Sequence, residues 1–302
     1  MIEKIIHIAI LLVLPPLLLG VINRIKAKFA GRVGPPLFQT YYDIIKLMRK
    51  DMVISDTTSW VFIAGPAITL VAVLLAGLLI PLGRFAAPIN FTGDLILFAY
   101  LFALARFFTT AAALDTGSSF EGMGAAREVT FACLSEPATF FAMLVLAKVS
   151  DSLTLTNMLH GPAGGFSIAV AAPLVLIAIG LFIVLLAETC RIPVDDPNTH
   201  LELTMIHEVM VLDHSGPLLG VILYASAVKL FILGSILMNI VVPVSSGIAW
   251  LDWLAAVVEL LVMAAAIGVV ESIMARLRMR HVPYLLTAAV MFCGFGFILL
   301  VR

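Results

Sequence analysis

Four ionisable residues stand inside long apolar stretches of the sequence and are the first candidates for chemistry: Arg106, Glu136, Lys229 and Glu259. A charged side chain within a bilayer is costly, so such a residue is a candidate for a proton or ion path. The structural alternative is an ion pair in which each charge only neutralises the other and fixes helix packing. The residue types leave both alternatives open.

The depths of these residues predict two pairs. Arg106 lies eight residues before the end of one predicted span and Glu136 eight residues after the start of the next, so both lie about 12 Å deep at about 1.5 Å per residue. Lys229 and Glu259 come within about one helical turn of a common depth near the bilayer centre. We expect an Arg106–Glu136 contact and a Lys229–Glu259 contact. Lys148 lies at the outer end of its span, where its flexible stem reaches water.

A second polar group follows the third and fifth apolar stretches. Carboxylates grouped at a low-dielectric boundary can have raised pKa values and pass protons on. The alternative is an ordinary solvated loop surface. Glu271 is either a helix-end charge or the inner end of a path that begins at Glu259. The group comprises Asp115, Glu121, Arg127 and Glu128, then Glu188, Arg191, Asp195, Asp196, Glu202, His207, Glu208 and Asp213.

The cysteines and histidines argue against a metal or redox centre within this chain. Cys133, Cys190 and Cys293 form no C-x-x-C pair, which excludes a sequence-local iron–sulfur, zinc or thiol redox motif. His200, His207 and His214 recur every seven residues, and two helical turns would place successive members about 10 Å apart, too far to share an ion. We expect no metal site, and we interpret His207 beside Glu208 as a titratable pair at most.

The composition is that of an integral membrane protein. Of 302 residues, 62% are hydrophobic and 12% are charged, and the mean hydropathy is +1.13. These values exclude a soluble enzyme. The 18 Lys and Arg against 19 Asp and Glu give a net charge of −1, so there is no basic excess that would indicate a nucleic-acid partner. The expected surroundings are the lipid bilayer.

The elements that carry these residues are predicted to be helices of one membrane domain, 1–302. A bilayer core needs about 20 apolar residues per helix, and no internal repeat or second domain is visible. The fold class is therefore an all-α polytopic helical bundle. The predicted spans lie near 5–22, 60–82, 94–114, 128–149, 166–188, 217–240, 250–274 and 282–301.

The loops predict the orientation, because cytoplasmic loops retain positive charge. One set of alternate loops holds twelve basic residues and the other holds three, which places both termini outside the cytoplasm. The twelve are Arg24, Lys26, Lys28, Arg32, Lys46, Arg49, Lys50, Arg127, Arg191, Arg276, Arg278 and Arg280, and the three are Lys4, Arg84 and Arg302.

Two segments on the cytoplasmic side are predicted to be helical without spanning the membrane. Residues 37–50 place Leu37, Tyr41 and Ile45 on one helical face and charged residues around the other, which is typical of an interfacial helix. Residues 199–212 follow a Pro-Val-Asp-Asp-Pro turn and mix apolar with charged residues, which predicts a short helix under the bundle.

Three stretches carry a family pattern. The strongest is ARFFTTAAALDTGSSFEGMGAAREVTFACLSEP, from 105 to 137. The others are Arg32, Gly34, Pro35, Gln39, Asp43, Lys46 and Leu47 after the first span, and ETCRIPVDDPNTHLEL from 188 to 203. Together they resemble the large membrane-anchor subunit shared by complex I and the membrane-bound NiFe hydrogenases, and most closely the hydrogenase branch that includes formate hydrogenlyase and hydrogenase-4.

The resemblance implies a subunit that docks a cytoplasmic arm and connects its electron transfer to ion-pumping subunits in the cell inner membrane. The partners would be the hydrogenase large and small subunits, iron–sulfur subunits and antiporter-like membrane subunits. The NiFe centre and the clusters would lie in those partners, and this chain would have no catalytic centre or cofactor of its own. The docking candidates are Arg32, Gln39, Asp43, Lys46, Asp115, Arg127, Arg191 and Asp195, and the path candidates are Arg106, Glu128, Glu136, Glu188, Glu202, Glu208, Lys229, Glu259 and Glu271.

One departure from the family pattern favours the hydrogenase branch. The loop after the fifth span has Asn198 and His200 where the family commonly has acidic residues, and Val194 where it has phenylalanine. A quinone site therefore belongs only to an alternative interpretation, the quinone-site subunit of a complex I-like dehydrogenase. A third interpretation, a stand-alone secondary carrier, would predict an inverted repeat, and the sequence shows none.

Overall fold

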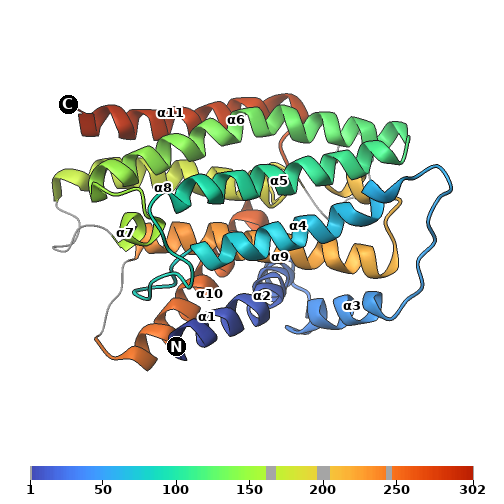
Figure 1. Ribbon diagram of the computed structural model, residues 1–302, viewed down its shortest axis with the longest axis horizontal. Helices are drawn as coiled ribbons and strands as arrows, with labels where there is room; N and C mark the ends of the chain where they lie inside the picture. Colours follow the sequence, from blue (N-terminus) through green and yellow to red (C-terminus); the bar gives the residue numbers. More distant parts are fainter. Residues whose placement is uncertain (1, 161–167, 196–204, 243–246, 302) are drawn as a thin grey trace.

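The computed structural model describes residues 2–160, 168–195, 205–242 and 247–301. Within these ranges the chain is helical and has no β-strand, which confirms the all-α membrane bundle. Among the described residues, seven helices are long and apolar enough to cross a membrane, and a bent pair at the start of the chain makes eight when it counts as one span. Figure 1 shows the long helices side by side, with both chain ends toward the side of α7 (Leu155–His160) and the α3–α4 loop on the opposite side.

The first predicted span, 5–22, is a broken helix and not a straight one. α1 (Ile2–Val13) and α2 (Pro15–Phe29) meet at an angle of 45°. Pro15 and Pro16 have no backbone N–H and cannot continue the hydrogen bonds of α1. Two tyrosines from other helices bond the carbonyls left at the break: Tyr41 donates to Val13 O, and Tyr224 donates to Leu12 O at 2.8 Å.

The predicted interfacial helix is present as α3 (Gln39–Met48), and its whole length remains at least partly exposed. It is seated on glycines of two neighbouring helices. A Cβ on Gly20 of α2 would collide with the Leu37 carbonyl, and a Cβ on Gly220 of α9 (Gly216–Val241) would press on Leu47. The absence of side chains at these two positions lets α3 and its leading turn lie directly against the bundle.

Six long helices form the bundle in which most of the ionisable residues of the spans lie. It consists of α4 (Trp60–Leu79), α5 (Asp94–Asp115), α6 (Ser119–Ser150), α8 (Ile168–Glu188), α9 and α11 (Val282–Val301). α6 begins nine residues before the predicted start at 128. The helix continues through Gly122 and Gly124, and at 32 residues it is longer than a membrane span requires. α7 is a short helix that the sequence did not predict.

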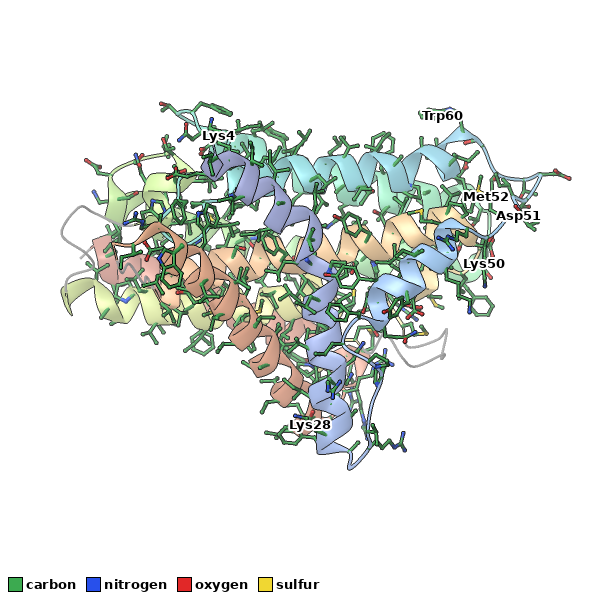
Figure 2. The ribbon with its side chains drawn as sticks, turned by 90° about the horizontal axis from the view of Figure 1, so that it is seen from below. Lys4, Lys28, Lys50, Asp51, Met52 and Trp60 are labelled. Atoms are coloured by element: carbon green, nitrogen blue, oxygen red, sulfur yellow. The ribbon has the colours of Figure 1, made fainter. Side chains whose placement is uncertain are left out.

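α10 (Ala249–Ile273) packs mainly against α2 and leaves the row of parallel helices. Figure 2 shows α2, which ends near Lys28, running at a steep angle to the helices above it, while Lys50, Asp51, Met52 and Trp60 mark the loop at the far side. The segment predicted as a helix over 199–212 forms only a short 3-10 helix, η1 (Glu208–Val211), within its described part. A second short turn, η2 (Met279–His281), leads into α11.

Candidate functional site

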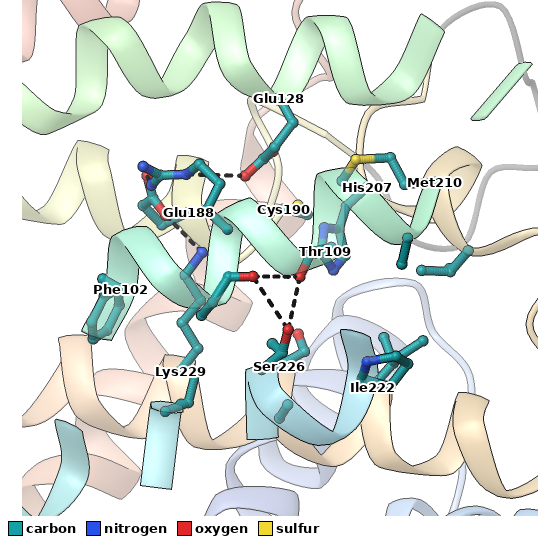
Figure 3. Close-up of a pocket in the computed structure, with 18 of the residues that line it drawn as sticks. Phe102, Thr109, Glu128, Glu188, Cys190, His207, Met210, Ile222, Ser226 and Lys229 are labelled. Atoms are coloured by element: carbon teal, nitrogen blue, oxygen red, sulfur yellow. Dashed lines mark hydrogen bonds and ion pairs between the residues drawn. The ribbon is translucent and has the colours of Figure 1, made fainter. Parts of the chain in front are cut away.

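The site is built around Glu188, the last residue of α8. Its side chain is 9% exposed, and both carboxylate oxygens are engaged. One oxygen accepts hydrogen bonds from Arg106 Nη2 at 2.7 Å and from Ser135 Oγ at 2.6 Å, and the other lies 2.6 Å from Lys229 Nζ. Figure 3 shows the contact of Lys229 with Glu188 and the position of Glu128 beside them. One carboxylate thus joins helices α5, α6, α8 and α9.

Arg106 collects two further carboxylates from α6. Its guanidinium pairs with Glu136 and lies 3.7 Å from Glu128. The predicted Arg106–Glu136 contact is therefore confirmed. Glu188 and Glu128 join it, which the depth argument did not foresee.

The predicted Lys229–Glu259 pair is wrong. Lys229 reaches Glu188, and Glu259 makes no ion pair with any described residue. Rise per residue gives the depth of a side chain but not the direction in which it leaves its helix. Lys229 leaves α9 toward α8, whereas Glu259 lies on a half-exposed flank of α10.

The five side chains Arg106, Glu128, Glu136, Glu188 and Lys229 form what we call the ion cluster. When all are ionised, the three carboxylates outweigh the two cations by one negative charge. Interactions between charges are strong in such a poorly solvated place, and an excess charge is correspondingly costly. Uptake of one proton would make the numbers of positive and negative charges equal.

A small cavity of about 60 Å³ adjoins the ion cluster, and several polar side chains reach its largely apolar wall. At about 30 Å³ for each water in the liquid, it has room for about two water molecules. Its wall includes the Thr69 and Thr109 hydroxyls, which lie 3.2 Å apart, and Ser226. Figure 3 shows Thr109, Ser226 and His207 around this space. None of the three hydroxyl residues was predicted, because single Ser and Thr residues within a span carry no spacing signal.

His207 and Cys190 line the same cavity outside the spans. Burial lowers the pKa of His207, and the nearby Glu128 carboxylate opposes part of that effect. Burial raises the pKa of the Cys190 thiol well above its usual range, and the Glu128 and Asp195 carboxylates add to the rise. Both side chains are therefore neutral at pH 7, and they line the cavity without adding charge.

A larger cavity of about 460 Å³ lies on the other side of Arg106. Most of its wall is apolar and comes from α5 and α6, including Phe102 and Met143. Arg106, Glu136 and Glu188 lie at one part of the wall, and the Glu136 side chain is 50% exposed. Arg106 and Glu188 therefore lie in the walls of both cavities.

A second set of ion pairs fixes the loop after α8. Glu271 of α10 is buried and lies 2.7 Å from Lys26 of α2 and 3.4 Å from Arg191. Asp195 accepts a bond from Arg276 at 2.8 Å and another from the Ile206 amide at 2.9 Å. Glu271 thus lies near the end of α10, where two cations neutralise its charge.

Several predicted docking residues hold the chain together. Asp115 accepts from the Ser59 amide at 2.7 Å and the Phe62 amide at 3.3 Å at the start of α4, and Arg127 donates to Met205 O at 2.7 Å. Arg191 and Asp195 belong to the ion pairs after α8.

By contrast, Arg32, Asp43 and Lys46 are exposed, and Gln39 donates to Asp43 at 2.8 Å within α3. Glu208 lies half-buried in η1, and Glu202 and Asp196 lie outside the described residues.

Comparison with known proteins places this geometry in a family. The family model described as NADH dehydrogenase matches residues 2–302. The chain belongs to the NADH dehydrogenase family. Within this family it is 31% identical to "Formate hydrogenlyase subunit 4" of Escherichia coli (strain K12) over 298 residues, which are 95% of this chain and 93% of that protein.

Other members of the NADH dehydrogenase family extend the comparison. The chain is 32% identical to "Hydrogenase-4 component C" of Escherichia coli (strain K12), over 78% of this chain and 73% of that protein. It is 29% identical to an NADH-quinone oxidoreductase subunit of Polaromonas naphthalenivorans (strain CJ2), over 62% of this chain and 54% of that protein. The predicted resemblance to the hydrogenase branch and to complex I is confirmed.

A solved structure supports the fold of this family member independently. A chain in the structure of the membrane-bound sulfane sulfur reductase, an archaeal respiratory membrane complex, superposes with a TM-score of 0.82. The match covers 99% of this chain and 98% of that chain at 22% identity. The fold of this chain is therefore shared with a chain of a solved membrane complex.

Proposed function

We propose that this chain is the membrane-anchor and coupling subunit of an energy-converting hydrogenase. It docks a cytoplasmic arm that holds a NiFe centre and iron–sulfur clusters, and it links electron transfer in that arm to proton or sodium translocation. The two relatives above 30% identity carry the names of formate hydrogenlyase and hydrogenase-4 subunits, which supports this assignment.

The observation that carries the coupling role is the ion cluster with its unequal charges. Three carboxylates face two cations beside a cavity with room for water. Taking up and releasing one proton changes the cluster between a neutral and a negative state. Each change alters the attraction of Glu188 for Arg106 on one side and for Lys229 on the other. Proton transfer is thereby tied to the relative positions of α5, α8 and α9.

The partners follow from this assignment. Hydrogenase large and small subunits and iron–sulfur subunits bind on the cytoplasmic side, where Arg32, Asp43 and Lys46 are exposed. Antiporter-like subunits lie beside the chain in the cytoplasmic membrane, and both termini are extracytoplasmic. The redox centres belong to the arm, and this chain supplies the anchor and the ion cluster.

The alternative function, the quinone-site subunit of a complex I-like dehydrogenase, is supported by the similarity to the NADH-quinone oxidoreductase subunit of Polaromonas naphthalenivorans. It requires a long amphipathic cavity that opens near 37–50. Neither of the two cavities beside Arg106 is lined by any of those residues. The hydrogenase assignment needs no cavity at those residues.

The test is Glu188→Gln in the native complex, measured in sealed vesicles. Glutamine keeps the shape of glutamate and can bond Arg106 and Ser135, but it cannot ionise. We expect the complex to assemble and the arm to react with artificial electron carriers, while gradient formation is lost. The matched control is Asp56→Asn, which removes a carboxylate from an exposed loop and should leave the gradient intact.

Two outcomes contradict this proposal. Undiminished gradient formation by the assembled Glu188→Gln complex removes Glu188 from the coupling path. Loss of the assembled complex assigns Glu188 a structural role, because Lys229 is then left as an unpaired charge. Purification of bound quinone with the complex, and no nickel, favours the alternative function.

A further inference from the structure

Glu259 is the exception among the described ionisable side chains at membrane depth. Arg106, Glu136, Glu188 and Lys229 share the ion cluster, and towards the ends of α10 Asp252 pairs with Arg84 and Glu271 with Lys26. Glu259 makes no ion pair or hydrogen bond with any described residue. It lies ten residues from the start of α10 and fourteen from its end. At about 1.5 Å per residue, that position is about 15 Å from the nearer end, so water at the membrane surface is out of reach.

The surroundings of Glu259 are those of an uncovered helix face. Ala255, Glu259, Val262 and Ala266 recur at intervals of four, three and four residues and therefore share one side of α10. Val262 is 56% exposed, Ala266 is exposed, and Ala255 and Glu259 are partly exposed. We call these four residues the Glu259 face. The opposite side of α10 packs against α2 and α9 through Leu260, Ala264 and Ile267.

A lipid tail cannot satisfy a carboxyl group, so an exposed acidic side chain at this depth needs a polar partner. Small residues on either side allow another helix backbone to come close, and a polar side chain at the centre of such a contact holds membrane helices together. The isolated chain thus has a surface that is complete only when a complementary helix covers it. Figure 2 shows α10 beside α2, at a steep angle to the other long helices.

We propose that the Glu259 face is an interface for a transmembrane helix of another subunit, and that this helix presents a lysine or arginine to Glu259 near the centre of the bilayer. Glu259 is a carboxyl group with no partner among the described residues, and a lysine or arginine would both hydrogen-bond it and neutralise its ionised form. The proposal rests on the proposed function in one respect, because it requires the chain to be part of a multisubunit membrane complex.

The first experiment places a photo-crosslinking amino acid at Val262 in the native complex within its own membrane. We expect a crosslink to one other membrane subunit. The matched control is the same amino acid at Val71, which is 56% exposed on α4 and on a different face of the molecule. It should give a lipid adduct or a different partner. A crosslink at Val262 only to lipid, or only to a second copy of this chain, overturns the proposal.

The second experiment compares Glu259→Leu with the unmodified chain in two settings. In the chain alone in detergent, we expect an unchanged or higher unfolding temperature, because no described residue loses a partner. In the native complex, we expect the crosslinked subunit to be lost in at least about half of the particles. Equal subunit content in the two complexes overturns the proposal, as does a lower unfolding temperature of the chain alone.

A charge exchange then tests the chemistry of the contact. Glu259→Lys should release the neighbouring subunit, and replacement of the crosslinked partner's cation by glutamate in the same strain should restore it. These outcomes are independent of the Glu188 test. A complex that assembles through Glu259 but forms no gradient contradicts the proposed function alone, and a pumping complex that is indifferent to Glu259→Leu contradicts this inference alone.

Discussion

At the scale of single residues, Arg106 is the side chain on which the ion cluster depends most, because it contacts three carboxylates. Arg106→Ala leaves those carboxylates facing one cation, and we expect a loss of about 3–5 kcal/mol in the free energy of unfolding. Glu136→Ala should cost less, because Glu136 is half-exposed and Arg106 keeps Glu188. Unfolding of the purified chain in detergent measures both.

The double variant decides whether the Arg106–Glu136 contact contributes energy of its own. If it does, the combined cost falls below the sum of the two single costs by about 0.5–3 kcal/mol. Additive costs would mean that the contact has no net effect. Lys148→Met is the control, because Lys148 is exposed at the outer end of α6 and has no part in the cluster.

At the scale of elements, the break between α1 and α2 depends on hydrogen bonds from elsewhere. Tyr224 of α9 donates to Leu12 O, whose helical donor would be the N–H that Pro16 lacks. Tyr41 of α3 donates to Val13 O, because the Leu17 N–H bonds Leu14 O instead. Within the membrane no water replaces a lost donor. We expect Tyr41→Phe and Tyr224→Phe each to lower the free energy of unfolding by about 1–3 kcal/mol.

The neighbouring Tyr42 supplies the matched control for this prediction. Its side chain is 60% exposed, and no described hydroxyl bond involves it, so Tyr42→Phe should be neutral. Thermal unfolding in detergent compares the three variants. Equal midpoints for all three would show that the break is held by packing alone.

The same elements show what could be predicted from the sequence. The lengths of the apolar stretches predicted the spans. The helical spacing of apolar and charged residues predicted α3. The break at Leu14 was missed, although Pro15 and Pro16 mark it, because an apolar count does not register backbone donors. Depth along a helix predicted the Arg106–Glu136 contact, whereas the partner of Lys229 depended on helix rotation, which is set by packing among several helices.

At the scale of the whole molecule, the charge on the loops predicts the orientation in the membrane. Figure 1 shows α3 and the loop that follows it on one side of the molecule, and α7 with both chain ends on the opposite side. In a Cys133→Ser background, a cysteine replacing Asp151 should react with an impermeant maleimide in intact cells. A cysteine replacing Asp56 should react only after lysis. The reverse pattern would invert the topology and place the arm on the other side.

The close contact between α3 and α9 at Gly220 has a mechanical consequence. Gly220, on which Leu47 rests, and Lys229, which holds Glu188, are nine residues apart on one uninterrupted helix. A helix segment about 13–14 Å long therefore connects the contact with α3 at Gly220 to the ion cluster at Lys229. Because Gly220 has no side chain, Leu47 lies directly against the α9 backbone. We therefore expect a displacement of α3, for example on binding of the arm, to displace α9 as well. The interfacial helix and Lys229 are therefore connected through one continuous helix.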